Sequence, residues 1–213
     1  MKKLLLIILI IVIIIVGGVF IYQNLTKKKI EETSMPDLHS KKIAMVIAFR
    51  DFRDAEYFVP KEILEKAGAE ITTVSTRRGT AIGADGGEVE VDLLISETNP
   101  AEFDAVLFIG GPGCLENLDN ETSYQLVREV VSQNKVLAAI CISPVILARA
   151  GVLEGKRATV WSSPMDKAPV RILEESGAIY QEKLVAVDGK IVTANGPGAA
   201  EGFARAVVQA LKK

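Results

Sequence analysis

The sequence has a single histidine and only two cysteines, and it contains no Cys-x-x-Cys pair. A structural zinc site needs a cluster of such ligands and a small disulfide scaffold needs many more cysteines, so both classes are excluded. No GxxxxGK[ST] segment is present, which excludes phosphate binding of the P-loop type. The formal net charge of −2 gives no sign of a nucleic-acid partner. We therefore expect a globular protein that is stabilised by an apolar core and holds neither a metal nor a cofactor.

A long apolar run stands at the start of the chain. Residues Leu4–Tyr22 carry no charge and consist mainly of Ile, Leu and Val, close to the roughly 20 residues that cross a bilayer as a helix. The run exceeds the roughly 7–15 apolar residues of a cleaved signal peptide, and Gly17-Gly18 matches a cleavage site poorly. We predict an uncleaved, single-pass membrane anchor over residues 1–22. The alternative, a helix buried in a soluble core, is disfavoured because the run is apolar on every side.

The side of the membrane on which the rest of the chain lies stays open. Lys2 and Lys3 precede the anchor and Lys27–Lys29 come after it, which slightly favours a cytoplasmic domain under the positive-inside rule. A short basic start before an apolar run is equally the pattern of an anchor that exports the rest of its chain. Residues 23–41 are polar and without apolar periodicity, which predicts a tether, and residues 42–213 are expected to form the globular domain.

Within that domain, short apolar runs alternate with segments of helical spacing. The run Ile43–Ala48 suits a strand that is buried on both faces, and segment 57–67 has helical spacing and stops at Gly68. Asp188-Gly189 predicts a hairpin between 184–187 and 191–193. The alternation predicts an α/β fold, a parallel sheet with helices on both faces. Further strands are expected at 71–74, 89–95, 105–109, 136–140 and 158–161, and further helices at 120–133, 144–150, 168–176 and 199–211.

A cysteine stands at one corner between a strand and a helix. Sites of open parallel sheets form beyond the carboxyl ends of the strands, so segments 49–56, 110–114 and 141–143 should meet at one edge. Cys141 ends its strand abruptly, and the next helix would point N–H groups and positive dipole toward it. Such surroundings lower the pKa of a thiol, and we therefore expect Cys141 to be a reactive nucleophile. The alternative is a buried, inert cysteine.

A carboxylate and a glycine pair are expected beside this thiol. Glu56 is the proton partner that we select, because Asp51 and Asp54 are better explained as loop and capping residues. The alternative for Glu56 is that it only complements a helix dipole. Gly110 and Gly111 come after a buried strand, and their backbone amides could approach a developing negative charge, although a tight turn would also explain them.

Two further residues lie at the same edge. We place Ile142, the residue after the cysteine, with the two glycines as a candidate binding residue for a substrate or an oxyanion. Cys114 is by default a buried thiol, and its alternative role is that of a resolving partner for an oxidised Cys141.

The chain resembles the ThiJ/PfpI family, the superfamily of the parkinsonism-associated deglycase, of intracellular protease-like proteins and of glutamine amidotransferase-like domains. The matching segments, which together span nearly all of residues 42–211, are DAEYFVPKEILEKAGAEI at 54–71, AVLFIGGPG at 105–113, AAICISPVILARAGVLEGKRAT at 138–159 and VDGKIVTANGPGAAEGFARAVVQAL at 187–211. The resemblance implies a flavodoxin-like sandwich, an elbow cysteine at Cys141, a glutamate at Glu56 that contacts its sulfur, and pocket glycines at Gly110 and Gly111. It also implies a homo-oligomer, and activities that range from deglycase and glyoxalase chemistry to peptidase activity, chaperoning and oxidative-stress sensing.

The chain departs from this family where many catalytic members carry a histidine. Ile142 stands directly after the cysteine, serines occupy 162–163, and the single histidine, His39, falls in the predicted tether. Because amide hydrolysis needs an acid for the leaving group, peptidase activity is disfavoured. We therefore expect either a cysteine enzyme that acts on small reactive carbonyls or their adducts, or a non-catalytic sensor of peroxide or binding module.

Overall fold

The computed structural model describes residues 17–18 and 37–212. The predicted anchor lies outside the described residues except for Gly17 and Gly18, and so does the predicted tether up to residue 36. Among the described residues, no helix is long and apolar enough to cross a membrane. The compact unit of the fold begins at Asp37. Leu38, a residue of the predicted tether, is buried and donates its N–H to the Ala67 carbonyl at 2.7 Å.

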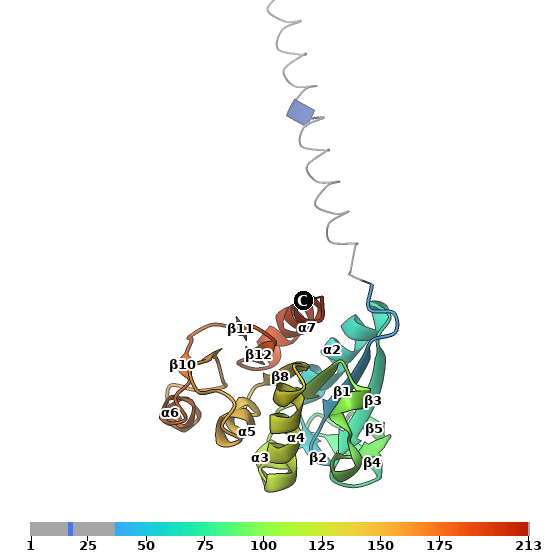
Figure 1. Ribbon diagram of the computed structural model, residues 1–213, viewed down its shortest axis with the longest axis horizontal. Coiled ribbons are helices and arrows are strands. Elements are labelled where there is room, and N and C mark those ends of the chain that lie inside the picture. The colour runs from blue at the N-terminus through green and yellow to red at the C-terminus, as the bar shows by residue number, and fades with distance from the viewer. Residues whose placement is uncertain (1–16, 19–36, 213) are drawn as a thin grey trace, which may run out of the picture. The chain divides into compact units, whose positions relative to one another are not determined.

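Within residues 37–212, seven strands form one central sheet in the order β11-β12-β8-β7-β1-β3-β6 (Figure 1). All neighbours are parallel except the β11–β12 pair. The parallel alternation that the sequence predicts is therefore confirmed. The strands are β1 (Lys42–Val46), β3 (Glu70–Ser75), β6 (Leu93–Leu94), β7 (Ala105–Phe108), β8 (Val136–Ile140), β11 (Val185–Asp188) and β12 (Ile191–Ala194).

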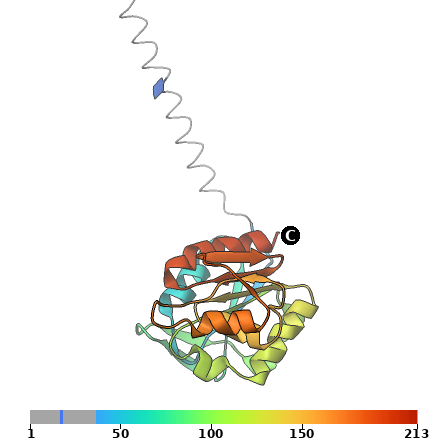
Figure 2. The ribbon, with the colours of Figure 1, turned by 90° about the vertical axis from the view of Figure 1, so that its left-hand side faces the viewer.

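Burial explains why the central strands form a sheet rather than helices. All residues of β7 and β8 are buried, because helices cover both faces of these strands. Helices α2 and α7 pack together on one face, and α4 and α5 lie over the other, as the two views in Figures 1 and 2 show. The helices are α2 (Asp54–Lys66), α3 (Cys114–Leu118), α4 (Glu121–Ser132), α5 (Pro144–Arg149), α6 (Ala168–Glu175) and α7 (Ala200–Ala210), with 3-10 turns η1 (Ile95–Glu97), η2 (Pro100–Glu102) and η3 (Pro197–Ala199).

Local sequence signals set several of these boundaries. The Asn120 side chain accepts from the Ser123 N–H at 3.2 Å and begins α4. Gly68, Gly151 and Gly177 stand after their helices with positive φ, the conformation that ends a helix most readily at glycine. The hairpin predicted around Asp188-Gly189 is confirmed as the antiparallel β11–β12 pair.

The small sheets differ from the predictions. The segment expected as one strand over 89–95 is divided between β5 (Glu88–Val91), which pairs with β4 (Gly79–Gly83), and β6 of the central sheet. The chain changes sheets at Asp92, whose N–H and carboxylate both bond to the backbone of Thr73. In the segment 158–161, only Ala158 is a strand residue, in β9 (Arg157–Ala158), paired with β10 (Ile179–Tyr180). The third strand beside β4 and β5 is β2 (Arg50–Phe52), in a segment predicted as a loop.

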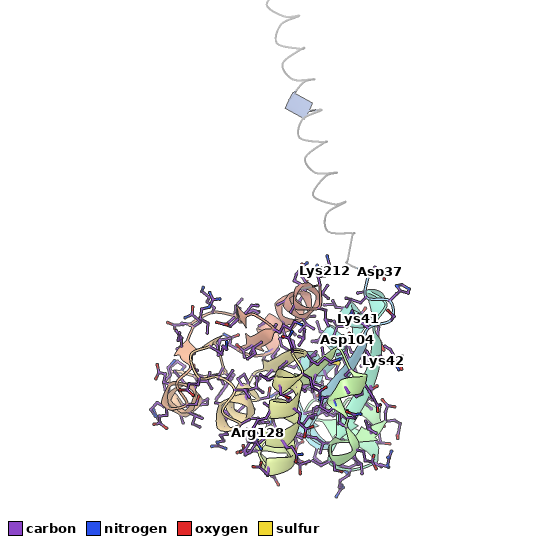
Figure 3. All side chains as sticks on the ribbon, in the orientation of Figure 1. Asp37, Lys41, Lys42, Asp104, Arg128 and Lys212 are labelled. Carbon is purple, nitrogen blue, oxygen red and sulfur yellow. The ribbon has the colours of Figure 1, made fainter. Side chains whose placement is uncertain are left out.

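The amino edge of the central sheet carries charged residues that lie away from the elbow cysteine. Lys41 Nζ lies 2.9 Å from Asp104 Oδ1, and the Lys42 N–H donates to the same carboxylate at 3.0 Å. These contacts join the starts of β1 and β7 (Figure 3). Because parallel strands all run in one direction, the other edge of the sheet collects their carboxyl ends.

Candidate active site

Cys141 occupies a tight corner directly after β8, three residues before α5 begins at Pro144. Its backbone φ is +66°, a left-handed conformation that costs a residue with a side chain free energy. Two backbone hydrogen bonds hold this conformation: the Cys141 N–H donates to the Ala194 carbonyl, and the Cys141 carbonyl accepts from the Trp161 N–H, both at 2.8 Å. The end of β12 and the segment after β9 therefore hold the backbone from which the thiol projects.

Ser143, a residue that the sequence analysis missed, supports the corner through its buried hydroxyl group. Its side chain is fully buried, and its hydroxyl lies 2.8 Å from the Phe108 carbonyl and 2.7 Å from the Ile140 carbonyl. The same oxygen accepts from the Ile140 N–H at 2.9 Å. These contacts join the end of β8 to the end of β7, so Ser143 is a positioning residue for the elbow. Its only signal in the sequence is a small polar residue two positions after the cysteine.

Glu56 lies in the first turn of α2 and has no exposed surface. A Cβ built on Gly110 would lie 2.7 Å from Glu56 Oε2 and 2.5 Å from the Cβ of Cys141. The carboxyl group and the cysteine side chain therefore meet against the bare backbone of Gly110. The structure thus brings together three residues that the sequence analysis selected from three separate segments.

Burial and the neighbouring groups together set the pKa of the Glu56 carboxyl group. Burial raises the pKa of Glu56 to about 7, while the neighbouring Cys141 thiol, the Arg53 charge and the Gly110 N–H lower it in part. Neither carboxylate oxygen has a partner with full hydrogen-bond geometry, so these contacts offset the desolvation incompletely. A carboxyl group with this pKa can both accept and donate a proton near neutral pH.

The thiol itself is harder to ionise than the sequence predicted. Burial, followed by the charge of Glu56 and its hydrogen bond, raises the pKa of Cys141 to about 12. The backbone N–H groups of Ile142 and Gly111 act in the opposite direction. The expectation that the corner alone would lower this pKa is therefore wrong, because desolvation outweighs the N–H groups. Once Glu56 is protonated, its charge no longer opposes the thiolate, so the two groups titrate as one pair.

Any residue other than glycine at position 111 would force the loop to move. The φ of Gly111 is +121°, and a Cβ there would lie 2.4 Å from the backbone nitrogen of Arg53 and 2.5 Å from the Asp51 carbonyl oxygen. The glycine loop is pinned to the segment after β1 by the Arg53 N–H bond to the Gly110 carbonyl at 3.0 Å and the Gly113 N–H bond to Asp51 at 3.1 Å. The Gly111 N–H from this loop acts on the Cys141 sulfur and favours its thiolate.

The thiol opens into a cavity of about 320 Å³. Its walls come mainly from segments that lie just beyond β2, β7 and β8, as the convergence of strand ends predicts. Most of its lining is apolar. The one lining residue whose side chain carries a fixed charge is Arg53, which the sequence analysis missed. The lining residues are Arg53, Gly111, Pro112, Leu115, Cys141, Ile142 and Trp161. Gly110 and Glu56 stand behind this surface rather than on it.

The other carboxylates of this segment hold the backbone. Asp54 accepts from the N–H groups of Asp85 at 2.8 Å and Gly87 at 2.6 Å, and so joins the start of α2 to the turn between β4 and β5. The Asp51 carbonyl accepts a hydrogen bond from the Gly113 N–H of the glycine loop. Asp51 itself has a left-handed backbone conformation, with φ +57°. Both therefore serve as loop residues.

Cys114 is fully buried at the start of α3, and burial raises its pKa well above the ordinary range. A thiol in this state has little thiolate, so the structure gives no support to a resolving role for Cys114. In the part of the chain that the structure describes, both cysteines are free.

His39 lies at the opposite edge of the sheet from the cysteine. A Cβ on Gly68 would lie 2.5 Å from His39 Nδ1, which places this ring beside the turn that leads into β3. The side chain is 82% exposed and pairs with Asp37. Ser162 and Ser163 stand where many catalytic family members are expected to carry a histidine. The Lys167 ammonium donates to the Ser162 hydroxyl at 3.3 Å. Within the described residues, no group of three or more His, Cys, Asp or Glu side chains could hold a metal ion.

Several known proteins resemble this chain in sequence and in fold. Residues 41–210 match the DJ-1/PfpI family. An uncharacterized protein of Methanocaldococcus jannaschii is 41% identical over 178 residues, which cover 83% of this chain and 85% of that protein. The deglycase PfpI of Pyrococcus furiosus is 32% identical over 168 residues, 79% of this chain and 98% of that protein. A crystal structure of a ThiJ/PfpI domain protein from Brachyspira murdochii superposes with a TM-score of 0.77 at 37% identity, covering 82% of this chain and 98% of that one.

Proposed function

Since the chain belongs to the DJ-1/PfpI family, we propose that it is a cysteine-dependent enzyme of the glyoxalase and deglycase type, acting on small reactive carbonyls or their adducts. One observation carries the proposal: Cys141 lines a cavity of about 320 Å³, and the Glu56 carboxyl group meets the Cys141 side chain just behind that lining. A nucleophile next to a group that takes up and releases protons near neutral pH is the minimum that covalent carbonyl chemistry requires.

The first step is addition of the sulfur to a carbonyl carbon. The Glu56 carboxylate takes the thiol proton as the sulfur–carbon bond forms, and the electron pair of the C=O bond moves to oxygen. The N–H groups of Gly111 and Ile142, which face the sulfur, are the donors available to this negative oxygen. The Glu56 carboxylic acid then returns the proton to the oxygen and is a carboxylate again.

For a 2-oxoaldehyde, the same carboxylate can complete the conversion. It moves the proton from the former aldehyde carbon to the oxygen of the neighbouring carbonyl, which gives an enediol. A second transfer, of the hydroxyl proton on the former aldehyde carbon to the neighbouring carbon, gives a thioester on Cys141. Water hydrolyses the thioester to a 2-hydroxy acid and restores the thiol. Substrate and water together contain all the atoms of the product, so the sequence of steps needs neither oxidant nor reductant.

Peptide hydrolysis has less support from this site. Expulsion of an amine needs an acid beside the leaving nitrogen, and a Cys–His pair supplies it in cysteine peptidases. The single histidine of the chain is His39, which does not line the cavity.

Turnover of methylglyoxal tests the enzyme proposal. We expect the wild-type protein to consume methylglyoxal and form lactate, and Cys141→Ala to abolish this activity with an unchanged circular dichroism spectrum. Cys114→Ala is the matched control and should retain activity, because Cys114 is buried outside the cavity lining. Absence of lactate with the folded wild-type protein, or equal activity in Cys141→Ala, would overturn the proposal.

The missing histidine favours a second candidate, a sensor of peroxide. A thiolate at Cys141 would attack one oxygen of hydrogen peroxide, release hydroxide and become a sulfenic acid, and a second peroxide would give the sulfinic acid. This route needs no leaving-group acid. Intact-mass measurement after limited peroxide should then show added oxygen on wild type and none on Cys141→Ser, without turnover of methylglyoxal in either protein.

We also propose that residues 1–22 anchor the domain to a membrane, because Leu4–Tyr22 is uncharged and long enough to span one. The full chain should stay with membranes after alkaline carbonate washing, whereas a chain starting at Asp37 should not. Release of the full chain by carbonate would refute the anchor.

A homo-oligomer is proposed from the family resemblance, and light scattering of the domain from Asp37 tests it.

A further inference from the structure

We propose that Arg53 makes the cavity selective for electrophiles that carry a carboxylate. This inference rests on the proposed function for its biological setting, but the binding preference that it describes can be measured on the thiol alone. Arg53 is the one residue of the cavity lining whose side chain carries a fixed charge, and the chemistry of the Cys141–Glu56 pair gives that charge no role.

The lining leaves a polar substrate few other partners. Pro112, Leu115, Ile142 and Trp161 present mostly apolar surface, and Cys141 is the reacting group. A guanidinium in such surroundings attracts an anion more strongly than it would in water, because the apolar walls reduce dielectric screening. The cavity thus combines one cation with one nucleophile in a space at the lower end of the range for small-molecule sites.

The guanidinium of Arg53 has donors to spare. Among the described residues, its side-chain hydrogen bonds all go to Asp85, and both leave from Nη1, at 3.2 Å to each carboxylate oxygen. These contacts are longer than those of a tight charge-assisted pair. Nε and Nη2 make no hydrogen bond within the described part of the chain, and together they form the planar fork that binds a carboxylate through both oxygens. The Arg53 side chain is 31% exposed, so a ligand can reach it.

Arg53 is also placed next to the reacting pair. It is the residue before the first turn of α2, and its carbonyl accepts from the Glu56 N–H at 3.1 Å. Its charge lowers the pKa of Glu56, which shows that it acts within electrostatic reach of the carboxyl group. A carboxylate held by the fork would therefore lie at the same cavity wall as the sulfur. The electrophilic carbon of a short molecule would then face Cys141.

The expected substrates are small aldehydes with a carboxylate tail. A 2-oxoaldehyde such as 4,5-dioxopentanoate presents the same reacting group as methylglyoxal and adds the anion. The Arg53 fork would hold that anion while Cys141 adds to the aldehyde carbon. Hydrogen bonds to charged groups contribute about 1.5–3 kcal/mol, which corresponds to roughly tenfold to hundredfold in rate.

A pair of alkylating agents isolates this effect. Iodoacetate and iodoacetamide have nearly the same shape and both alkylate Cys141: the sulfur–carbon bond forms, the carbon–iodine bond breaks, iodide leaves and the thiol proton goes to Glu56. The ratio of their rate constants cancels any common change in the reactivity of the thiol. We expect Arg53→Gln to lower the iodoacetate-to-iodoacetamide ratio by about tenfold or more.

Asp85→Asn is the matched control, because it removes the charge that competes for Arg53 and leaves the cavity lining unchanged. This variant should raise the ratio, and added salt should lower the ratio in wild type more than in Arg53→Gln. A ratio that is equal in wild type, Arg53→Gln and Asp85→Asn overturns the inference. Arg53→Lys guards against a folding defect, since it keeps the charge and should keep part of the preference.

Turnover separates this inference from the proposed function. If neither methylglyoxal nor 4,5-dioxopentanoate is converted while the alkylation ratio falls in Arg53→Gln, the enzyme proposal fails and the anion preference stands. If both aldehydes are converted with unchanged relative kcat/KM in Arg53→Gln, the anion preference fails and the enzyme proposal stands.

Discussion

Glu56 and Cys141 approach each other beside the α-carbon of Gly110, which carries no side chain to separate them. The point where a Cβ of that glycine would lie is 2.7 Å from Glu56 Oε2 and 2.5 Å from the Cys141 Cβ. The contact joins the first turn of α2 to the corner after β8, and burial of the carboxyl group sets its pKa at about 7. Reactivity, pH-dependent stability and backbone strain at this corner should all reflect that contact and the backbone that supports it.

Reactivity of the thiol should depend on the protonation of Glu56. The pair becomes reactive when it loses the first of its two protons, as the pH rises through about 7, whichever atom keeps the second. The second proton leaves only near about 12, where the thiol ionises fully. Iodoacetamide alkylation of Cys141 should therefore rise about tenfold per pH unit below 7 and level off above it. Glu56→Gln should remove the step near 7 and shift the rise toward the alkaline range. The same profile in both proteins, or no inflection below 8.5 in wild type, would falsify the shared proton.

Stability should show the opposite trend with pH. Burial raises the folded pKa of Glu56 from its ordinary 4.5 to about 7, so the folded protein holds the proton more tightly than the unfolded chain. Stability is therefore complete below about 4.5 and falls as the pH rises through about 7, by up to about 3 kcal/mol. Glu56→Gln avoids this loss and should melt higher than wild type at pH 8, by roughly 5–10 °C. Denaturation monitored at pH 5 and 8 checks the sign, and a wild type that gains stability relative to Glu56→Gln above pH 7 contradicts it.

Gly110→Ala should break the pair without altering either member. The added methyl group would lie closer to the Cys141 Cβ, to Glu56 Oε2 and to the Ile140 carbonyl than non-bonded atoms tolerate, and two of these atoms belong to the site. We expect a destabilisation of about 1–3 kcal/mol and at least a tenfold slower alkylation at neutral pH.

Gly198→Ala is the control for that substitution, because a Cβ at Gly198 meets nothing within 4 Å and its φ is not left-handed. It should change neither quantity by a measurable amount. Normal alkylation in a folded Gly110→Ala protein would show that the thiol and the carboxyl group do not depend on their close approach.

The backbone of Cys141 should carry a measurable cost. At φ +66° a residue with a Cβ is strained and glycine is not. Cys141→Gly should therefore be more stable than Cys141→Ala by about 1 kcal/mol, measured by urea denaturation. At Ala148, inside α5, the same change from alanine to glycine should destabilise the protein by about 1 kcal/mol. Equal or lower stability of Cys141→Gly would show that the elbow stores no strain.

The sequence by itself determined the layered architecture and the choice of reacting residues. Continuous apolar runs such as 43–48 and 136–140 suit strands covered on both faces, and their alternation with helices favours a parallel arrangement of those strands. Parallel strands bring their carboxyl ends to one edge, so the sequence alone indicates that Cys141, Glu56 and Gly110 of separate segments share a site.

Only the tertiary structure decided how that site is charged. The pKa of a thiol depends on the balance between desolvation and the N–H groups that face it, and this balance depends on what packs around the corner rather than on the corner itself. The sequence also did not predict that Arg53 lines the cavity. Arg53 stands between a three-residue strand and a helix, and so short a polar segment has no periodicity that could be interpreted. Topology is set by patterns that extend along the chain, whereas electrostatics depends on distances between groups that are far apart in it.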